Sequence, residues 1–319
     1  MALKRRNFIK DLSFSALGIS IYPRLINTNK IDSKVSKPFF EISLAEWSLH
    51  RTLRKGELTN MNFPAKAKND FSINAVEYVD QFFQDKVHNK RYMDELKKRT
   101  IDLNVKNLLI MVDTAGALAD TDDTNRIKSV ENHYQWIDAA KFLGCHSVRV
   151  NLRGKGSKES LEIASVDALR RLSEYGAKNE ISVIVENHGG VSSDGKWLTN
   201  VIKQVDNPYC GTLPDFDNWC ISSEQTGPDI KCVNKYDSFL GTKEMMPYAR
   251  GVSAKSRSFD DQGNERNIDF LNLIRIVKEE KTDFFKGFIG IEYAGNDLSE
   301  DAGIRATKDL LERVGQVLG

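Results

Sequence analysis

The sequence predicts an α/β protein, a single-domain (β/α)8 TIM barrel, because short apolar runs alternate with longer helical segments along most of its length. Eight such units follow residue 36, and eight is the number that closes this barrel. The short runs are apolar on both faces, as in a parallel sheet that helices cover. The runs expected to form strands are 39–45, 75–79, 107–112, 147–151, 182–186, 211–215, 251–254 and 287–292.

Two of the helical segments show their periodicity clearly. Apolar residues recur at three- and four-residue steps from Leu161 to Tyr175 and again from Ile304 to Leu318, so each segment has one face to bury. The alternative fold is an open doubly wound sheet, which typically carries a glycine-rich phosphate turn after an early strand. The first run leads instead into Glu46-Trp47-Ser48-Leu49-His50. We therefore favour the barrel.

The N-terminus has the form of a twin-arginine export signal. Lys4-Arg5-Arg6-Asn7-Phe8-Ile9-Lys10 precedes an apolar run from Leu12 to Tyr22 that is too short to span a bilayer. We predict a leader over residues 1–36, a barrel over 37–319 and a periplasmic location. No small-x-small cleavage site is evident between Pro23 and Ser36, so a retained signal that tethers the protein to the membrane stays open, as does a basic amphipathic helix on a cytoplasmic protein.

Composition excludes some classes of partner. The chain is 40% hydrophobic and 29% charged with a net charge of +1, so it lacks the basic excess that nucleic-acid binding needs. No second apolar stretch has membrane length, so no stable transmembrane partner is expected; the oligomeric state is not predicted. The four cysteines form no C-x-x-C pair. We expect mostly buried thiols; in an oxidising compartment a disulfide between Cys210 and Cys220 or between Cys220 and Cys232 stays open, because the sequence does not decide it.

Acidic residues end three of the expected strands. Glu186 ends the fifth, Asp215 the sixth and Glu292 the eighth, and the carboxyl ends of barrel strands carry the chemistry. His188 points to the same side as Glu186, because side chains alternate along a strand. Asp217 shares a side with Asp215, and either could be a ligand. Three carboxylates at one rim repel one another unless a cation or a proton offsets their charge.

Other polar residues near the strand ends are candidates for substrate binding. Lys255 follows the seventh strand and could neutralise an acid, hold a substrate oxygen or transfer a proton. Glu46, Trp47 and His50 after the first strand could form an aromatic wall of the kind that carbohydrate sites use. Further candidate donors to a sugar or carboxylate are Arg149, Asn151, Arg153 and Asn218.

Glu186, Asp215 and Glu292, with Ser253-Ala254-Lys255 before the last, resemble the xylose-isomerase-like barrels, the sugar phosphate isomerase/epimerase family. The resemblance covers nearly the whole chain after the leader and is more specific for the superfamily than for a substrate. In epimerases of this family, a glutamate, an aspartate, a histidine and a glutamate from the last four strands hold a divalent metal, and the two glutamates also move the proton. The resemblance thus implies that Glu186, Asp215 and Glu292 are metal ligands and that Glu186 and Glu292 are also catalytic.

The fourth ligand position differs from the family. Ser253 stands where the family has histidine. Three hypotheses follow: His188 replaces that ligand, the site binds its metal weakly, or Lys255 supplies the charge and no metal binds. We favour a metal (Mn, Mg or Zn), because one lysine is a small counter-charge for three inward carboxylates.

The resemblance implies an isomerase or epimerase that abstracts a proton next to a carbonyl. Export favours a non-phosphorylated, small-molecule carbohydrate as substrate. One alternative is a lyase or dehydratase acting on a 3-keto-glycoside or an inosose, and another is a catalytically silent carbohydrate-binding barrel. An endonuclease of the same superfamily would need more histidine ligands than the five histidines here provide, together with a basic groove.

Overall fold

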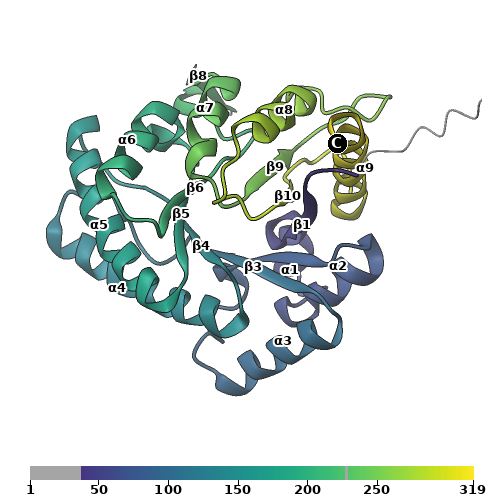
Figure 1. Ribbon diagram of the computed structural model, residues 1–319, viewed down its shortest axis with the longest axis horizontal. Coiled ribbons are helices and arrows are strands. Elements are labelled where there is room, and N and C mark those ends of the chain that lie inside the picture. The colour runs from purple at the N-terminus through teal and green to yellow at the C-terminus, as the bar shows by residue number, and fades with distance from the viewer. Residues whose placement is uncertain (1–36, 227–228) are drawn as a thin grey trace, which may run out of the picture. The chain divides into compact units, whose positions relative to one another are not determined.

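The computed structural model describes residues 37–226 and 229–319 and confirms the (β/α)8 barrel (Figure 1). The predicted export signal lies outside the described residues. Eight parallel strands form one sheet in the order β6-β5-β4-β3-β2-β1-β10-β9. They are β1 (Glu41–Ala45), β2 (Ala75–Val79), β3 (Lys106–Met111), β4 (Ser147–Val150), β5 (Ser182–Glu186), β6 (Cys210–Leu213), β9 (Val252–Ser256) and β10 (Phe288–Tyr293).

The two edge strands of this sheet, β6 and β9, meet at a seam that completes the ring. Isolated parallel bridges join Thr212 to Ala249 and Asp215 to Ser253. Ser253 N donates to Pro214 O at 2.9 Å, and Phe216 N donates to Ser253 O at 3.1 Å. The strand β6 ends at Leu213, two residues earlier than expected, because proline has no N–H to continue the ladder.

Helices surround the sheet and begin at defined caps (Figure 1). Seven of the described helices follow an Asn, Asp or Ser whose side chain accepts a backbone N–H of the first turn. None of the helices in the described ranges combines the length and apolarity that a membrane span requires. The helices are α1 (His50–Arg54), α2 (Phe63–Phe71), α3 (Lys90–Asp102), α4 (Asp123–Leu143), α5 (Lys158–Asn179), α6 (Gly195–Val205), α7 (Ser238–Met245), α8 (Phe270–Glu280) and α9 (Glu300–Leu318), with 3-10 turns η1 (Glu46–Leu49), η2 (Asn60–Asn62), η3 (Asp80–Phe82), η4 (Gly190–Ser193) and η5 (Met246–Tyr248).

An antiparallel hairpin, which the sequence did not predict, follows β6. It consists of β7 (Cys220–Thr226) and β8 (Asp229–Lys235), and the described side chains of both strands are partly or fully exposed. A disulfide joins Cys220 to Cys232 with their Cα atoms 5.8 Å apart, which decides between the two pairings left open. Cys145 and Cys210 are buried free thiols, as expected.

Strand alternation separates two apolar layers. The main core lies between the strands and the helices and contains, for example, Val183 and Val185 of β5. A smaller cluster fills the inside of the barrel: Ala45, Val79, Leu109, Met111, Ile184 and Leu213. Because Ile184 faces inward, Glu186 two residues later does so too. The same parity turns Lys255 of β9 and Glu292 of β10 inward, and these two residues are register partners. Polar side chains therefore gather above this inner apolar cluster, at the carboxyl end of the barrel.

Candidate active site

A cleft of about 660 Å³ opens among the loops that follow the strands. Its lining comes from the segments after β1, β2, β3, β4, β5, β6, β9 and β10, so nearly the whole chain contributes. The lining includes four residues expected to bind substrate, Trp47, Arg149, Asn218 and Lys255, and also His188, which was expected as a metal ligand. This is the position at which the active sites of such barrels lie.

Three buried carboxylates meet at this end of the barrel. Glu186, Asp215 and Glu292 each offer one oxygen, and the three oxygens lie within 4.8 Å of one another. Glu292 lines the cleft, whereas Glu186 and Asp215 lie beneath its surface. Within the ranges that the structure describes, this is the group of acidic, histidine or cysteine ligands that could hold a metal ion.

Asp215 is fixed by its own loop. Its backbone N donates to Asn187 Oδ1 at 2.7 Å, and its Oδ1 accepts the backbone N–H groups of Asp217 and Asn218 at 2.7 and 2.9 Å. Burial raises the pKa of Asp215 to about 8, and the charges of Glu186 and Glu292 add to the effect. Asp217, the alternative ligand, instead accepts a hydrogen bond from Arg257 Nε at 2.5 Å. The geometry thus brings Asp215, and not Asp217, to the carboxylate group.

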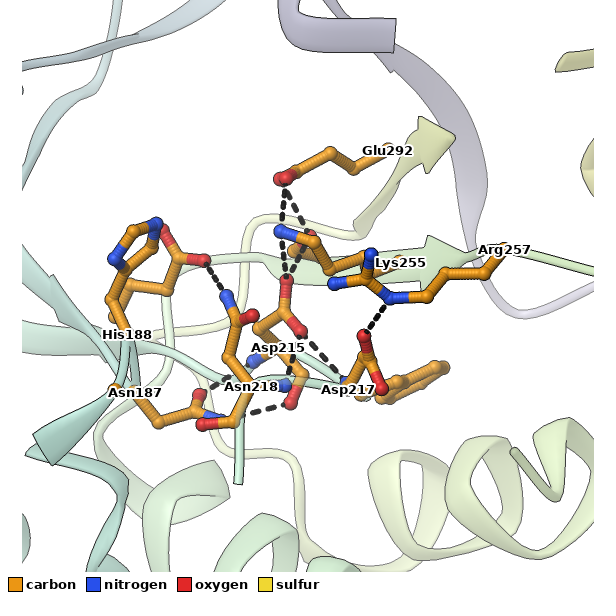
Figure 2. Close-up of polar contacts among 12 residues, drawn as sticks. Asn187, His188, Asp215, Asp217, Asn218, Lys255, Arg257 and Glu292 are labelled. Atoms are coloured by element: carbon orange, nitrogen blue, oxygen red, sulfur yellow. Dashed lines mark hydrogen bonds and ion pairs between the residues drawn. The ribbon is translucent and has the colours of Figure 1, made fainter. Parts of the chain in front are cut away.

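Lys255 lies between two of the carboxylates (Figure 2). Its Nζ is 2.5 Å from Glu292 Oε1 and 3.8 Å from Asp215 Oδ2. Burial acts to raise the pKa of Glu292, but the charge and hydrogen bond of Lys255 outweigh burial and keep that pKa below its ordinary value. Conversely, these carboxylates raise the pKa of Lys255 despite its burial. Lys255 is therefore a charged partner of Glu292.

Ser253 bridges the same two acids. Its Oγ is 2.9 Å from Asp215 Oδ2 and 3.2 Å from Glu292 Oε2. One hydroxyl has one proton to donate, so both contacts are hydrogen bonds only when one carboxyl group carries a proton of its own. Asp215, with its raised pKa, is the acid suited to carry it.

Glu186 is held from the other side. Asn218 Nδ2 donates to its Oε1 at 2.8 Å, and Arg149 Nε lies 2.8 Å from its Oε2. The Arg149 contact is an ion pair without a well-directed hydrogen bond, because the N–H does not point along the line to the oxygen. Burial raises the pKa of Glu186, and Glu292 adds to the effect while Arg149 opposes it.

Asp113, at the end of β3, is a site residue that the sequence reading missed. It accepts hydrogen bonds from Arg149 Nη1 at 2.6 Å and from Asn151 Nδ2 at 2.7 Å. Burial acts to raise the pKa of Asp113, but Arg149 holds it well below the usual range. Asn151 thus holds Asp113 and does not line the cleft, although we expected it to bind substrate. An aspartate directly after an apolar strand was the available signal.

His188 lies in the cleft but apart from the three carboxylates. Its Nδ1 is 3.4 Å from Arg153 Nη2, and no nitrogen of its ring joins the group of oxygens within 4.8 Å of one another. Burial, followed by the charges of Arg149 and Lys255, lowers the pKa of His188 to about 4. The ring is therefore neutral at pH 7.

The aromatic wall forms in part. Trp47 and His50 line the cleft and stack with their ring centroids 4.8 Å apart. Glu46 does not belong to it: its carboxylate accepts from Asn60 Nδ2 and from Val79 N, both at 2.9 Å. Burial raises the pKa of Glu46 to about 8. Its hydrogen bonds hold the loop, and it does not line the cleft.

A second missed acid, Glu77, lies inside the barrel. Its Oε1 accepts from Ser43 Oγ at 2.6 Å, and its buried Oε2 has no hydrogen-bond partner in the described part of the chain. A Cβ on Gly290 would come within 2.5 Å of this carboxylate, so the glycine makes the room. Burial raises the pKa of Glu77 to about 7. A glutamate in the middle of the apolar run 75–79 was the signal.

Comparison with known proteins identifies the family of this chain. The sequence model of the xylose isomerase-like TIM barrel family matches residues 66–314. The chain belongs to this family. Curated proteins offer no match to its sequence. The family assignment agrees with the resemblance drawn from Glu186, Asp215 and Glu292.

Solved structures of xylose isomerase-like barrels and related proteins share the fold at low sequence identity. The IOLI protein with a bound zinc atom is 13% identical, with a TM-score of 0.67 over 88% of this chain and 99% of that one. L-ribulose 3-epimerase is 12% identical, with a TM-score of 0.65 over 88% and 95%. The probable 3-DHS dehydratase AsbF from Bacillus anthracis is 16% identical, with a TM-score of 0.61 over 85% and 98%. These likenesses describe the fold.

Proposed function

We propose that the chain is an enzyme, an isomerase or epimerase that abstracts a proton next to the carbonyl of a non-phosphorylated, small-molecule carbohydrate. The observation that carries the proposal is the meeting of Glu186, Asp215 and Glu292 at the base of the cleft of about 660 Å³. Family membership and the similarity to L-ribulose 3-epimerase support it.

Glu292 is the proposed base. It lines the cleft, and Lys255 keeps it ionised and therefore able to accept a proton. Lys255, also in the lining, is placed to donate to the substrate oxygen on which charge develops. Glu186 lies beneath the cleft surface and is the proposed second proton carrier. Trp47, Arg149 and Asn218 line the cleft and bind the sugar.

A divalent metal (Mn, Mg or Zn) fits the donor set of this site. Glu186, Asp215 and Glu292 would hold it through oxygen atoms, which suit these ions. When bound, the ion would polarise the carbonyl and hydroxyl oxygens of the sugar. The similar IOLI structure contains zinc. Ser253 is a poorer ligand than histidine, and Lys255 would have to release Glu292, so we expect weaker metal binding than four protein ligands give.

We also propose that residues 1–36 export the barrel of residues 37–319 to the periplasm. The arginine pair at Arg5 and Arg6 supports this, and so does the disulfide between Cys220 and Cys232, since disulfides persist in oxidising compartments. Replacing both arginines by lysine should leave the protein in the cytoplasm, as fractionation would show.

A lyase or dehydratase is the second candidate. β-Elimination begins with the same proton abstraction, and Lys255 beside Glu292 is a charged donor that could assist a leaving oxygen. The similarity to the probable dehydratase AsbF also favours it. A 3-keto-glycoside or an inosose would be the substrate.

Exchange of sugar C–H protons with deuterated solvent tests the proposal, because isomerisation, epimerisation and elimination all begin with that step. Wild-type protein is incubated with a panel of sugars, 3-keto-glycosides and inososes, and exchange is followed by NMR. Glu292→Gln should lower exchange by roughly two to four orders of magnitude. Glu312→Gln is the matched control, because Glu312 also pairs with a lysine, at 2.7 Å, but on the outer face of α9.

Exchange that survives Glu292→Gln would show that another group is the base. Tight binding of a panel sugar without any exchange would favour a catalytically silent carbohydrate-binding barrel. The presence of Ser253 in place of the family histidine is the observation that favours this alternative.

A further inference from the structure

The lining of the cleft is more basic than the chain as a whole. Four basic side chains and two carboxylates line it, whereas the net charge of the chain is only +1. Two of the basic groups are committed within the site: Arg149 to Asp113 and Glu186, and Lys255 to Glu292. The remaining two, Arg153 and Arg257, stand at the mouth and are about half exposed.

Arg257 is held so that one edge of its guanidinium stays available. Its Nε donates to Asp217 Oδ2 at 2.5 Å, and neither terminal nitrogen makes a hydrogen bond within residues 37–226 and 229–319. Arg257 lines the same cleft as Lys255 and Glu292, and Figure 2 shows its side chain extending toward the middle of this group of residues. Two parallel terminal N–H groups match the two oxygens of a carboxylate.

The backbone of Arg257 is fixed as well. Its N–H and that of Ser258 both donate to Glu265 Oε1, at 3.2 and 3.1 Å. On the other side, a Cβ on Gly295 would come within 1.8 Å of the Arg257 carbonyl oxygen, so the loop after β10 packs against it backbone to backbone. An arginine that is positioned in advance loses little conformational entropy when a ligand binds.

Arg153 is placed less firmly. Its Nη2 lies 3.4 Å from His188 Nδ1 and 4.0 Å from Asp113 Oδ1, an oxygen that already accepts from Arg149 and Asn151. Arg257 is therefore the better candidate for an anion receptor.

We propose that Arg257 binds a carboxylate carried by the sugar, so that the substrates are acidic sugars such as uronic acids. Lys255 and Arg257 are two residues apart at the end of β9 and lie on the same side, so a carboxylate on Arg257 keeps the sugar ring next to Lys255 and Glu292. The inference rests on the proposed function in placing a sugar in this cleft.

Isothermal titration calorimetry of the full chain tests this. The probes are D-glucuronate and D-galacturonate, the neutral methyl ester of each, and D-glucose 6-phosphate. At least one acid should bind about ten- to a hundredfold more tightly than its ester, as expected for a charge-assisted pair. Arg257→Gln should reduce that preference to less than twofold.

Arg171→Gln is the matched control. Arg171 is 48% exposed against 50% for Arg257, and its Nε likewise bonds one aspartate, Asp167 at 3.0 Å, on the outer helix α5. This variant should keep the full preference. Asp217→Asn, which removes the partner that orients Arg257, should reduce the preference in part and offers a second variant if Arg257→Gln unfolds.

Equal binding of acid and ester by wild-type protein would overturn the inference, and so would a preference that persists in Arg257→Gln. Tighter binding of glucose 6-phosphate than of either acid, lost in Arg257→Gln, would replace the carboxylate by a phosphate. Acid binding through Arg257 without solvent exchange would leave this inference standing and reject the proposed enzyme. Exchange of neutral sugars without any preference for acids would support the proposed enzyme and reject this inference.

Discussion

The floor and the mouth of the cleft are built in different ways. On the floor, Lys255, Glu292 and Asp215 are buried and tied to one another across neighbouring strands. At the mouth, Arg153 and Arg257 lie on loops and are about half exposed. Strand alternation fixes the floor and loops set the mouth, so we expect changes in the floor to remove chemistry and changes at the mouth to alter selectivity.

The largest effect should follow from removing a floor carboxylate. Glu186→Gln or Asp215→Asn should reduce bound metal from about one ion per chain to less than a tenth and lower turnover by about a thousandfold, because a neutral amide oxygen replaces one of three charged carboxylates. Metal analysis of purified protein and circular dichroism measure both the loss and the intact fold. Full metal content in both variants would place the ion elsewhere.

Lys255→Met should separate catalysis from metal binding. We expect turnover to fall about a hundredfold, because a charged donor to the developing oxyanion is lost. Metal affinity should rise, since the ammonium 2.5 Å from Glu292 Oε1 no longer competes for that carboxylate. Titration with Mn²⁺ checks the affinity. Weaker metal binding in this variant would mean that Lys255 supports the ion.

Glu77→Gln should change how stability depends on pH. Burial raises the pKa of Glu77 to about 7, above its value in the unfolded chain, so its contribution to stability is full below about pH 4.5 and declines as the pH rises toward 7. The variant removes this decline. Relative to wild type it should gain about 3 kcal/mol between pH 4.5 and pH 8. Urea unfolding with chelator present at both pH values measures the difference, and parallel pH profiles would contradict the expectation.

The β7–β8 hairpin, none of whose described residues lines the cleft, should give the smallest effect. The double variant Cys220→Ser, Cys232→Ser removes the disulfide from a hairpin that stands outside both apolar clusters. Limited proteolysis should cut the hairpin faster, while the midpoint of barrel unfolding changes by only a few degrees. Solvent exchange of panel sugars should change less than threefold. A large loss of exchange would show that the hairpin helps to position the buried residues of the site.

The sequence predicts the floor better than the mouth for a physical reason. Side chains alternate between the two faces of a strand, and a charged residue at the end of an apolar strand is expected on the face that reaches the polar end of the barrel. Glu186 and Glu292 could be found in this way. Contacts between the side chains of neighbouring strands cannot be read this way: Asn151 binds Asp113, and Ser253 bridges Asp215 and Glu292, because of how adjacent strands align and how β6 meets β9. The hairpin was missed because its exposed strands have no buried face and so show no apolar pattern.

The seam between β6 and β9 passes through the site itself. Asp215 and Ser253 form one of the isolated bridges that join the two edge strands, and each also contributes to the polar floor. A chain in which this last pair of strands has not yet met can have almost all of its helices and strands and still hold its acids on opposite edges of an open sheet. The proposed activity therefore requires the closed ring, because Asp215 and Ser253 meet only where β6 and β9 join.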